Sequence, residues 1–246
     1  MQEARLPVPL LSCWLILTII TTVTKADAQD PGPIGPFVLD LGGALVGVGQ
    51  NADLASNRGL WPDQLAPRSI GLNVGGHAYL FHWRAITFGV GVSAIVSSTG
   101  RTPGKGDPNP KGPTVKTRFS AVSPQLSFNF GDGDGWSYLS GGLGTSRMTV
   151  NPEQPTVPEQ RRAGTLNYGG GARWFIKPGL AFSFDARLFA ISPLPEFGDQ
   201  PGSPRMTRFA ISLGLSGANA PSAFIDMLQG GNIGKRLVKV SREPKS

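Results

Sequence analysis

Residues 86–96 read ITFGVGVSAIV, and this stretch decides the fold class. Apolar side chains take every second position, at Ile86, Phe88, Val90, Val92, Ala94 and Val96. The positions between them carry Thr87, Gly89, Gly91 and Ser93. A period of two places the two sets on opposite faces of a β-strand, whereas a helix needs a period near 3.6. The stretch therefore predicts a strand with one apolar face.

The same pattern extends to seven further segments. The eight predicted strands are Phe37–Gly49, Ser69–Phe81, Ala85–Ser98, Thr117–Phe130, Trp136–Thr149, Thr165–Ile176, Leu180–Ile191 and Met206–Ser216. They exceed the five or six residues usual in globular proteins, and they satisfy the roughly nine to eleven residues of a tilted bilayer-spanning strand.

The composition excludes several other classes of protein. The chain has 246 residues with 34 Gly, 22 Pro, 39% hydrophobic and only 16% charged residues, a net charge of +7 and a mean hydropathy of −0.07. A bundle of transmembrane helices would need several apolar runs of about 20 residues. The hydrophobic content is too high for an ordinary disordered chain. The glycines lack the three-residue period of collagen. One all-β domain rich in close backbone contacts fits this composition.

The connections between the predicted strands alternate in length. Short turns lie at His82-Trp83-Arg84, at Gly131–Gly135 and at Lys177-Pro178-Gly179. The long connections are Gln50–Arg68, Gly100–Lys116, Val150–Gly164 and Ser192–Arg205. In an up-and-down meander all long loops then lie at one end. The sequence predicts an eight-stranded antiparallel transmembrane β-barrel with short periplasmic turns and four long extracellular loops.

The N-terminus has the features of a secretion signal. Arg5 supplies the positive charge, residues 10–23 are mainly apolar, and Ala26-Asp27-Ala28 fits a cleavage site. We predict a cleaved signal peptide over residues 1–28, followed by a linker (29–36), the barrel (37–217) and a basic periplasmic tail (218–246). A transmembrane anchor is the alternative for the first segment. Lipidation at Cys13 is disfavoured because most of the apolar core follows that residue.

A two-residue period does not by itself tell which face is outside. A soluble ligand-binding barrel is apolar inside, and a membrane barrel is the reverse. The polar face carries mostly Gly, Ser, Thr and Asn, which favours a narrow lumen over a water-exposed wall. Its few charges are Asp40, Arg118, Arg147, Arg173, Asp185, Arg187 and Arg208. We predict a lumen cluster of Asp40, His77, Arg173, Asp185, Arg187 and Arg208, in which Arg173 pairs with Asp185.

Aromatic residues gather near the short turns. Tyr79, Trp83, Trp136, Tyr138 and Trp174 are predicted to form a girdle at the membrane–water interface. The alternative is that these rings fill one end of the barrel.

In pattern and topology, Phe37 to Ser216 resembles the small outer-membrane barrels typified by the OmpA transmembrane domain and OmpX. The resemblance implies a Gram-negative outer membrane, a monomeric eight-stranded meander and both termini in the periplasm. Two features depart from the family. Such barrels often end at a C-terminal aromatic residue, whereas the last strand here ends near Leu215 and a tail follows. That tail is too short for a peptidoglycan-binding domain.

No motif for catalysis, metal binding or a cofactor stands out, so the sequence predicts no enzyme. The expected partners are outer-membrane lipid and lipopolysaccharide; nucleic acid is not expected for a secreted chain, and any extracellular or periplasmic protein partner is unknown. The predicted function is a structural or surface-interaction role in the outer membrane. Passage of small or hydrophobic solutes is the alternative, and a lipid-modifying enzyme is less favoured because both histidines lie toward the turns.

Overall fold

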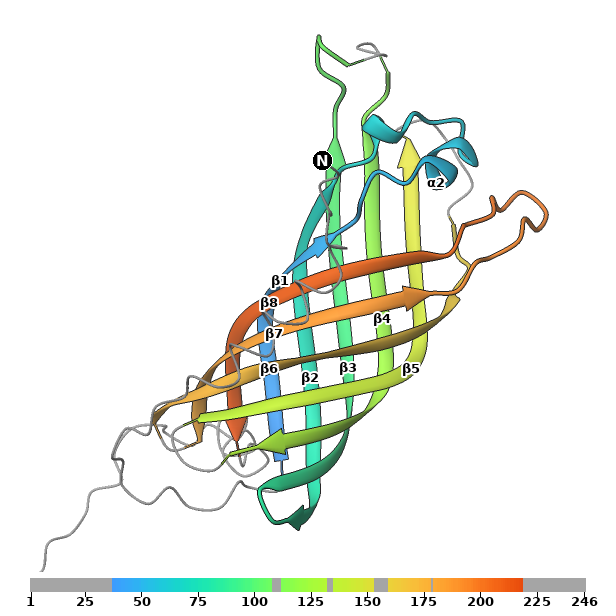
Figure 1. The fold of residues 1–246 in the computed structure, drawn as a ribbon. Coiled ribbons are helices and arrows are strands. Elements are labelled where there is room, and N and C mark those ends of the chain that lie inside the picture. Colours follow the sequence, from blue (N-terminus) through green and yellow to red (C-terminus); the bar gives the residue numbers. More distant parts are fainter. Residues whose placement is uncertain (1–36, 108–111, 132–134, 153–158, 178, 219–246) are drawn as a thin grey trace, which may run out of the picture.

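Eight antiparallel strands close into a barrel in the computed structural model (Figure 1). The structure describes residues 37–107, 112–131, 135–152, 159–177 and 179–218. Each strand pairs with the next in sequence, and β8 pairs with β1 to close the ring. The strands are β1 (Phe37–Gly47), β2 (Arg68–Trp83), β3 (Ile86–Arg101), β4 (Val115–Phe130), β5 (Gly135–Pro152), β6 (Ala163–Lys177), β7 (Leu180–Ile191) and β8 (Met206–Ala218).

The predicted fold class is confirmed, and the strands differ from the predicted ranges mainly at their ends. β4 and β5 start or finish beyond the predicted limits because pairing continues there, as at Arg101↔Val115 and Val115↔Pro152. The first turn also differs. His82 and Trp83 belong to β2, Trp83 pairs with Ile86, and the hairpin loop is Arg84 with Ala85. Arg84 has φ 55°, the left-handed conformation that tight hairpin loops require.

The barrel has two distinct ends. We call the end with the β2–β3, β4–β5 and β6–β7 connections the turn end, and the opposite end the loop end. β1 begins and β8 finishes at the turn end, where Val38 pairs with Ala218. The predicted signal peptide, the linker and the tail beyond Ala218 lie outside the described residues. Within the described part of the chain, no helix is long and apolar enough to cross a membrane.

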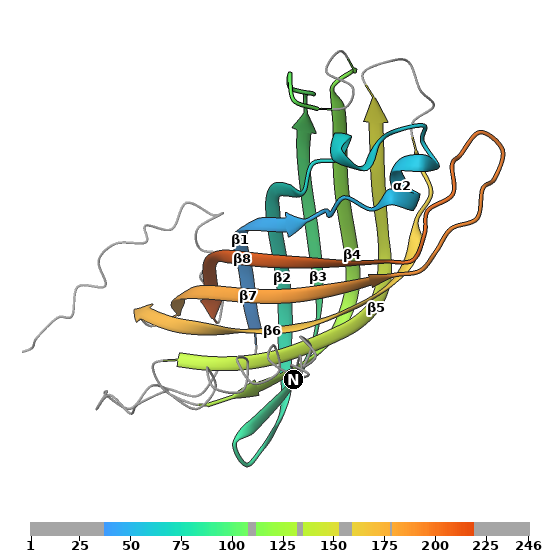
Figure 2. The same cartoon turned by 45° about the horizontal axis from the view of Figure 1, so that its top comes forward.

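The connection between β1 and β2 contains two short helices that the sequence reading did not predict. α2 (Ala52–Ser56) begins at Asn51, whose side chain accepts a hydrogen bond of 2.8 Å from the amide of Leu54. A 3₁₀ turn, η1 (Pro62–Gln64), follows. Two views place α2 at the loop end of the barrel (Figures 1 and 2). Leu54 and Leu65 are fully buried, so this connection covers the loop end.

Glycine allows the strands and their inward side chains to pack closely. A Cβ at Gly142 would lie 1.8 Å from the carbonyl oxygen of Pro124. A Cβ at Gly171 would lie 2.0 Å from the oxygen of Phe184 and 2.8 Å from the hydroxyl of Tyr138. Both glycines face the lumen, as predicted for a barrel barely wide enough for its own side chains.

Candidate functional site

The outward face is apolar and the inward face is polar over most of the barrel. Neighbouring residues of β4 show the contrast: Leu126 is 59% exposed, and Ser127 is 0% exposed. Leu72, Leu143 and Leu213 are likewise exposed on other strands. The inward face includes Ser, Thr, Asn and Gln side chains that are all buried. A soluble protein rarely exposes an apolar surface that runs around the whole molecule.

One arginine–aspartate pair lies across the middle of the lumen. Arg173 on β6 donates to Asp40 on β1, with Nη2–Oδ2 at 2.7 Å and Nε–Oδ1 at 3.0 Å. Ser216 on β8 also donates to Asp40. The guanidinium lies 4.0 Å from the ring centroid of Tyr138. This geometry pairs the Arg173 side chain, 0% exposed, with both oxygens of one carboxylate.

A second pair lies beside the first. Arg187 donates to Asp185, two residues before it on β7, with Nη2–Oδ2 at 2.9 Å. Nη1 of Arg187 donates to Gln125 and Asn167, and Nη2 also donates to Ser140, so the guanidinium reaches three further strands. Every one of these side chains is buried. The network thus ties four strands together through charge-assisted hydrogen bonds.

The predicted pairing of Arg173 with Asp185 is wrong. Gly171 is paired with Asp185, so the diagonal placement of Arg173 was correct. The Tyr138 hydroxyl instead donates to Asp185 at 2.8 Å while its ring stacks on Arg173. Tyr138 therefore joins the two ion pairs.

The other two predicted cluster members behave differently. His77 Nδ1 lies 3.7 Å from Asp40 Oδ2, and both ring nitrogens are buried without a hydrogen-bond partner in the described part of the chain. It borders a cavity of about 20 Å³, which is room for about one water molecule. Arg208 also faces the lumen, but its Nη2 points to the sulfurs of Met206 and Met148, at 3.1 and 3.4 Å.

The loop end of the lumen is an apolar core. Phe119 and Phe189 pack edge to face with centroids 5.5 Å apart. Leu54 and Leu65, from the α2 connection, belong to the same buried cluster. Arg58, just after α2, donates to both oxygens of Glu159 at 2.7 and 2.8 Å. These contacts hold the α2 connection against the barrel mouth.

The predicted aromatic girdle is only partly correct. Trp83 and Trp174 are 55% and 49% exposed, on the outward face. Tyr79, Trp136 and Tyr138 are buried inside the barrel. Trp136 packs edge to face on Tyr79 and Phe175, with centroids 6.3 and 5.0 Å apart. The alternative, that aromatics fill one end of the barrel, holds for Tyr79 and Trp136, whereas Tyr138 lies with the ion pairs in the middle of the lumen.

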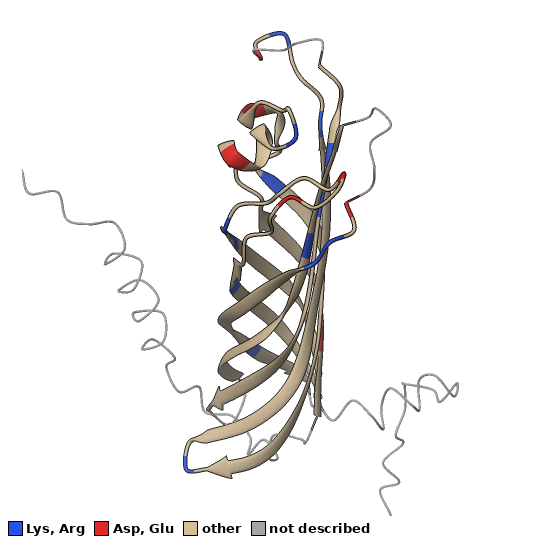
Figure 3. Cartoon of the chain, turned by 90° about the vertical axis from the view of Figure 1, so that its right-hand side faces the viewer, with Lys and Arg blue, Asp and Glu red and all other residues tan. Residues whose placement is uncertain are grey.

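Two arginines of the predicted polar face lie on the other side of the wall. Arg118 alternates with the inward residues Thr117 and Phe119, and Arg147 with Ser146 and Met148, so both face outward. The sequence could have shown this. Arg118 is an even number of positions from the apolar Leu126 on β4, and Arg147 from Leu143 on β5, so each arginine shares the outward face. Charged residues are concentrated toward the loop end in Figure 3.

An apolar outward surface around a polar, hydrogen-bonded interior is the arrangement of a membrane-spanning β-barrel, and the fold and the site assign the chain to that class. Among the described residues, no group of three or more His, Cys, Asp and Glu side chains is placed to hold a metal ion.

No family model matches the chain, and no curated protein matches it significantly. Solved structures of outer-membrane barrels are similar in fold. Neisserial surface protein A (NspA) is 10% identical, over 74% of this chain and 96% of that one, with a TM-score of 0.46. Ail, the attachment invasion locus protein of Yersinia pestis, is 16% identical, over 75% and 97%, with a TM-score of 0.44. OprG from Pseudomonas aeruginosa is 11% identical, over 75% and 95%, with a TM-score of 0.42.

Proposed function

We propose that the chain is an outer-membrane barrel with a structural or surface-interaction role, which presents its loop end outside the cell. The observation that carries this proposal is the filling of the interior at three successive levels. A filled lumen leaves the outer wall and the loop end as the surfaces available to partners.

The three levels differ in chemistry. The α2 connection and the Phe119–Phe189 contact fill the loop end with apolar side chains. The Asp40–Arg173 and Asp185–Arg187 pairs occupy the middle. Val38, Tyr79 and Trp136 fill the turn end. A solute moving along the axis would have to displace all three, which disfavours diffusion through the lumen.

Single-channel recording tests the proposal. The full chain, folded and inserted into planar bilayers, is expected to carry no stepwise current in 1 M KCl. Heat-dependent gel mobility of the same sample shows that the barrel is folded. Repeated current steps from a folded sample would overturn the structural role. Arg173→Ala with Asp40→Ala removes one ion pair of the middle level, and it should also stay closed because the loop end and the turn end remain filled.

A second candidate function, passage of hydrophobic molecules through the wall, is favoured by one local feature. The ladder between β4 and β5 is interrupted. Residues 123–125 of β4 and 142–144 of β5 are described but not paired with each other, whereas the residues on both sides of these stretches are paired. Pro124 lies in this interruption of the ladder, where the two backbones stay in close contact, and it has no amide hydrogen. Its oxygen points toward Gly142 on β5, so the missing N–H would also have faced β5.

Pro124→Val tests the second candidate. Valine restores a donor toward β5 and keeps an apolar outward side chain, so the seam gains a ladder hydrogen bond. If the seam is a route, uptake of a fluorescent alkane into proteoliposomes falls severalfold in the variant. The matched substitution Leu126→Val, two residues along the same face, is expected to leave uptake at the wild-type rate. Equal uptake in wild type, Pro124→Val and protein-free liposomes excludes the route.

A further inference from the structure

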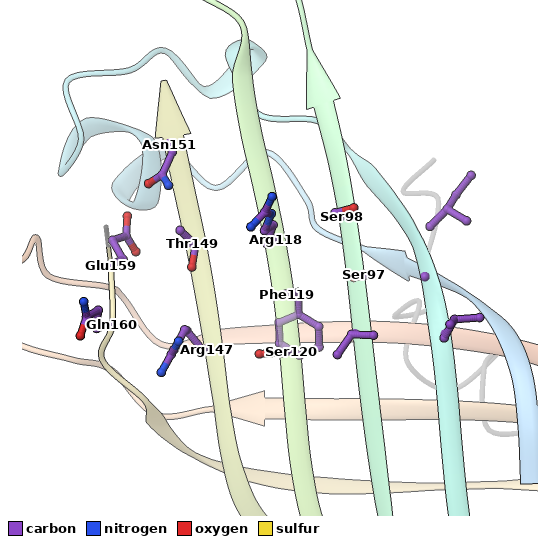
Figure 4. A pocket seen from close by; sticks show the side chains of 14 residues that line it. Ser97, Ser98, Arg118, Phe119, Ser120, Arg147, Thr149, Asn151, Glu159 and Gln160 are labelled. Carbon is purple, nitrogen blue, oxygen red and sulfur yellow. The ribbon is translucent and has the colours of Figure 1, made fainter. Parts of the chain in front are cut away.

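A pocket of about 730 Å³ lies against the outward wall near the loop end (Figure 4). Outward side chains of four adjacent strands, β2 to β5, line it. Ile70, Leu72 and Val96 supply apolar surface, and Ser120, Thr149 and Asn151 supply polar groups. Arg118 and Arg147 supply two positive charges. The pocket therefore combines an aliphatic part with a cationic part on a surface that faces the membrane.

The two arginines are diagonal neighbours on adjacent strands. Arg118 is paired with Thr149, and Ser120 is paired with Arg147. Diagonal positions of this kind have Cβ atoms about 7 Å apart, so two long side chains can reach one group. No salt bridge within the described residues uses either guanidinium, and Nε of Arg147 is buried without a hydrogen-bond partner.

Among the described residues that line the pocket, the one carboxylate is already engaged. Glu159 accepts two hydrogen bonds from Arg58, at 2.7 and 2.8 Å, and Arg58 lies on the α2 connection. The charge that the pocket offers to a ligand is therefore positive. Two further positive residues lie nearby without lining the pocket: Lys116 is two residues before Arg118 on the same outward face, and Arg162 donates to Thr145 at 3.4 Å.

The position along the strand matches the level of lipid headgroups. On β4 the outward apolar side chains run from Val122 to Phe130, and Ser120, Arg118 and Lys116 follow toward the loop end. At about 3.3 Å per residue and a tilt of about 40°, that apolar stretch covers about 20 Å of height, close to the about 25 Å apolar band of outer-membrane barrels. The arginines lie just beyond this band.

We infer that this pocket binds a phosphorylated lipid of the outer leaflet, of the lipid A type, with its phosphate between Arg118 and Arg147. Arginine presents paired N–H donors that match phosphate oxygens. An acyl chain of the same lipid lies along Ile70, Leu72 and Val96. The inference rests on the proposed placement in an outer membrane, and it specifies the class of lipid that binds to the outward surface of β2 to β5.

Native mass spectrometry of the full chain in detergent measures the binding directly. Each sample is first shown to be folded by its heat-dependent gel mobility. The chain is then titrated with lipid A bearing both phosphates, with dephosphorylated lipid A, and with inorganic phosphate alone. The test variant is Arg118→Gln with Arg147→Gln. The matched control, Arg84→Gln with Arg205→Gln, removes two arginines that do not line the pocket.

The wild type is expected to bind phosphorylated lipid A at least tenfold more tightly than the dephosphorylated form. The test variant loses roughly tenfold in affinity for each arginine, because each substitution removes charge-assisted hydrogen bonds to the phosphate. The control keeps wild-type affinity. The variant Arg118→Lys with Arg147→Lys keeps the positive charge and is expected to have an intermediate affinity. It tests the inference if the glutamine variant does not fold.

Three results would overturn the inference. The first is equal affinity of wild type and test variant for phosphorylated lipid A. The second is arginine-dependent binding of inorganic phosphate as tight as that of the lipid, which indicates a free-anion site. The third is an arginine-dependent dimer that excludes the lipid. Because none of these is a current measurement, their outcome is separate from that of the bilayer test of a closed lumen.

Discussion

At the scale of single residues, the Asp40–Arg173 pair stabilises the barrel most directly. Asp40→Asn removes the charge that balances Arg173, whose side chain is 0% exposed. Removing one partner of a buried pair leaves an uncompensated charge, so we expect the free energy of unfolding to fall by about 3–5 kcal/mol. Urea titration of the barrel folded in lipid vesicles, followed by tryptophan fluorescence and gel mobility, measures the change.

The double variant Asp40→Asn with Arg173→Met separates pairing from polarity. It leaves no unpaired charge in the middle of the lumen, so its stability should recover part of the loss. An Asp40→Asn barrel that unfolds at the wild-type urea concentration would contradict the assigned role of the pair.

A second residue-scale prediction concerns glycine. Gly171→Ala places a Cβ 2.0 Å from the Phe184 oxygen and 2.8 Å from the Tyr138 hydroxyl. Overpacking of this kind costs about 1–3 kcal/mol or prevents folding, and it displaces the tyrosine that joins the ion pairs. Gly43→Ala is the matched control, since nothing lies within 4 Å of its Cβ. Urea midpoints of the two variants should differ, and equal midpoints would show that the lumen has room to spare.

The sequence was sufficient to predict the strands and the existence of two faces, because both depend only on a period of two. It misplaced Arg118 and Arg147, which face outward, and three aromatic residues, which lie inside. All six predicted lumen residues do face inward. The sequence was not sufficient to predict which of these side chains pair with each other. Arg173 and Asp40 are 133 positions apart, and their contact depends on how the ring closes through β8 and β1. Tyr138 was assigned to the membrane interface by residue type, although its parity with Ser140 places it inside.

At the scale of elements, Arg58 links the α2 connection to two other loops. Its guanidinium binds Glu159, before β6, and Ser203, before β8, at 3.1 Å to the serine. Arg58→Ala should release the connection while the strands keep their ladders, so hydrogen exchange of residues 54–65 should quicken by at least tenfold. Arg68→Ala, at the exposed start of β2, is the matched control. Unchanged exchange in Arg58→Ala would show that apolar contacts alone hold the connection.

The α2 connection also shows where prediction from sequence ends. A helix of five residues has too few turns for a helical period to be visible, although Asn51 before Ala52-Asp53-Leu54 is a recognisable N-cap. The sequence around this connection does not mark any of its residues as buried. Burial of Leu54, Ala55 and Leu65 depends on the barrel mouth, which forms only when the strands close into a ring. The strands, by contrast, are long enough to be recognised one by one.

At the scale of the whole molecule, we expect the loop end to face the outside of the cell, and substituted cysteines measure this orientation directly. Its single cysteine, Cys13, lies in the predicted signal peptide, so a substituted cysteine in the barrel is the only thiol of the mature chain if that segment is removed. Lys105→Cys places a thiol in the β3–β4 loop, and Arg84→Cys places one in the β2–β3 hairpin; both positions are exposed.

On intact cells, a membrane-impermeant maleimide should label Lys105→Cys and leave Arg84→Cys unlabelled. After the outer membrane is permeabilised, both should react, since short turns of such barrels face the periplasm. Labelling of Arg84→Cys on intact cells, with Lys105→Cys protected, would reverse the orientation. It would also move Arg118 and Arg147 to the inner leaflet, away from lipid A, so the lipid assignment depends on this result as much as on the affinity measurements.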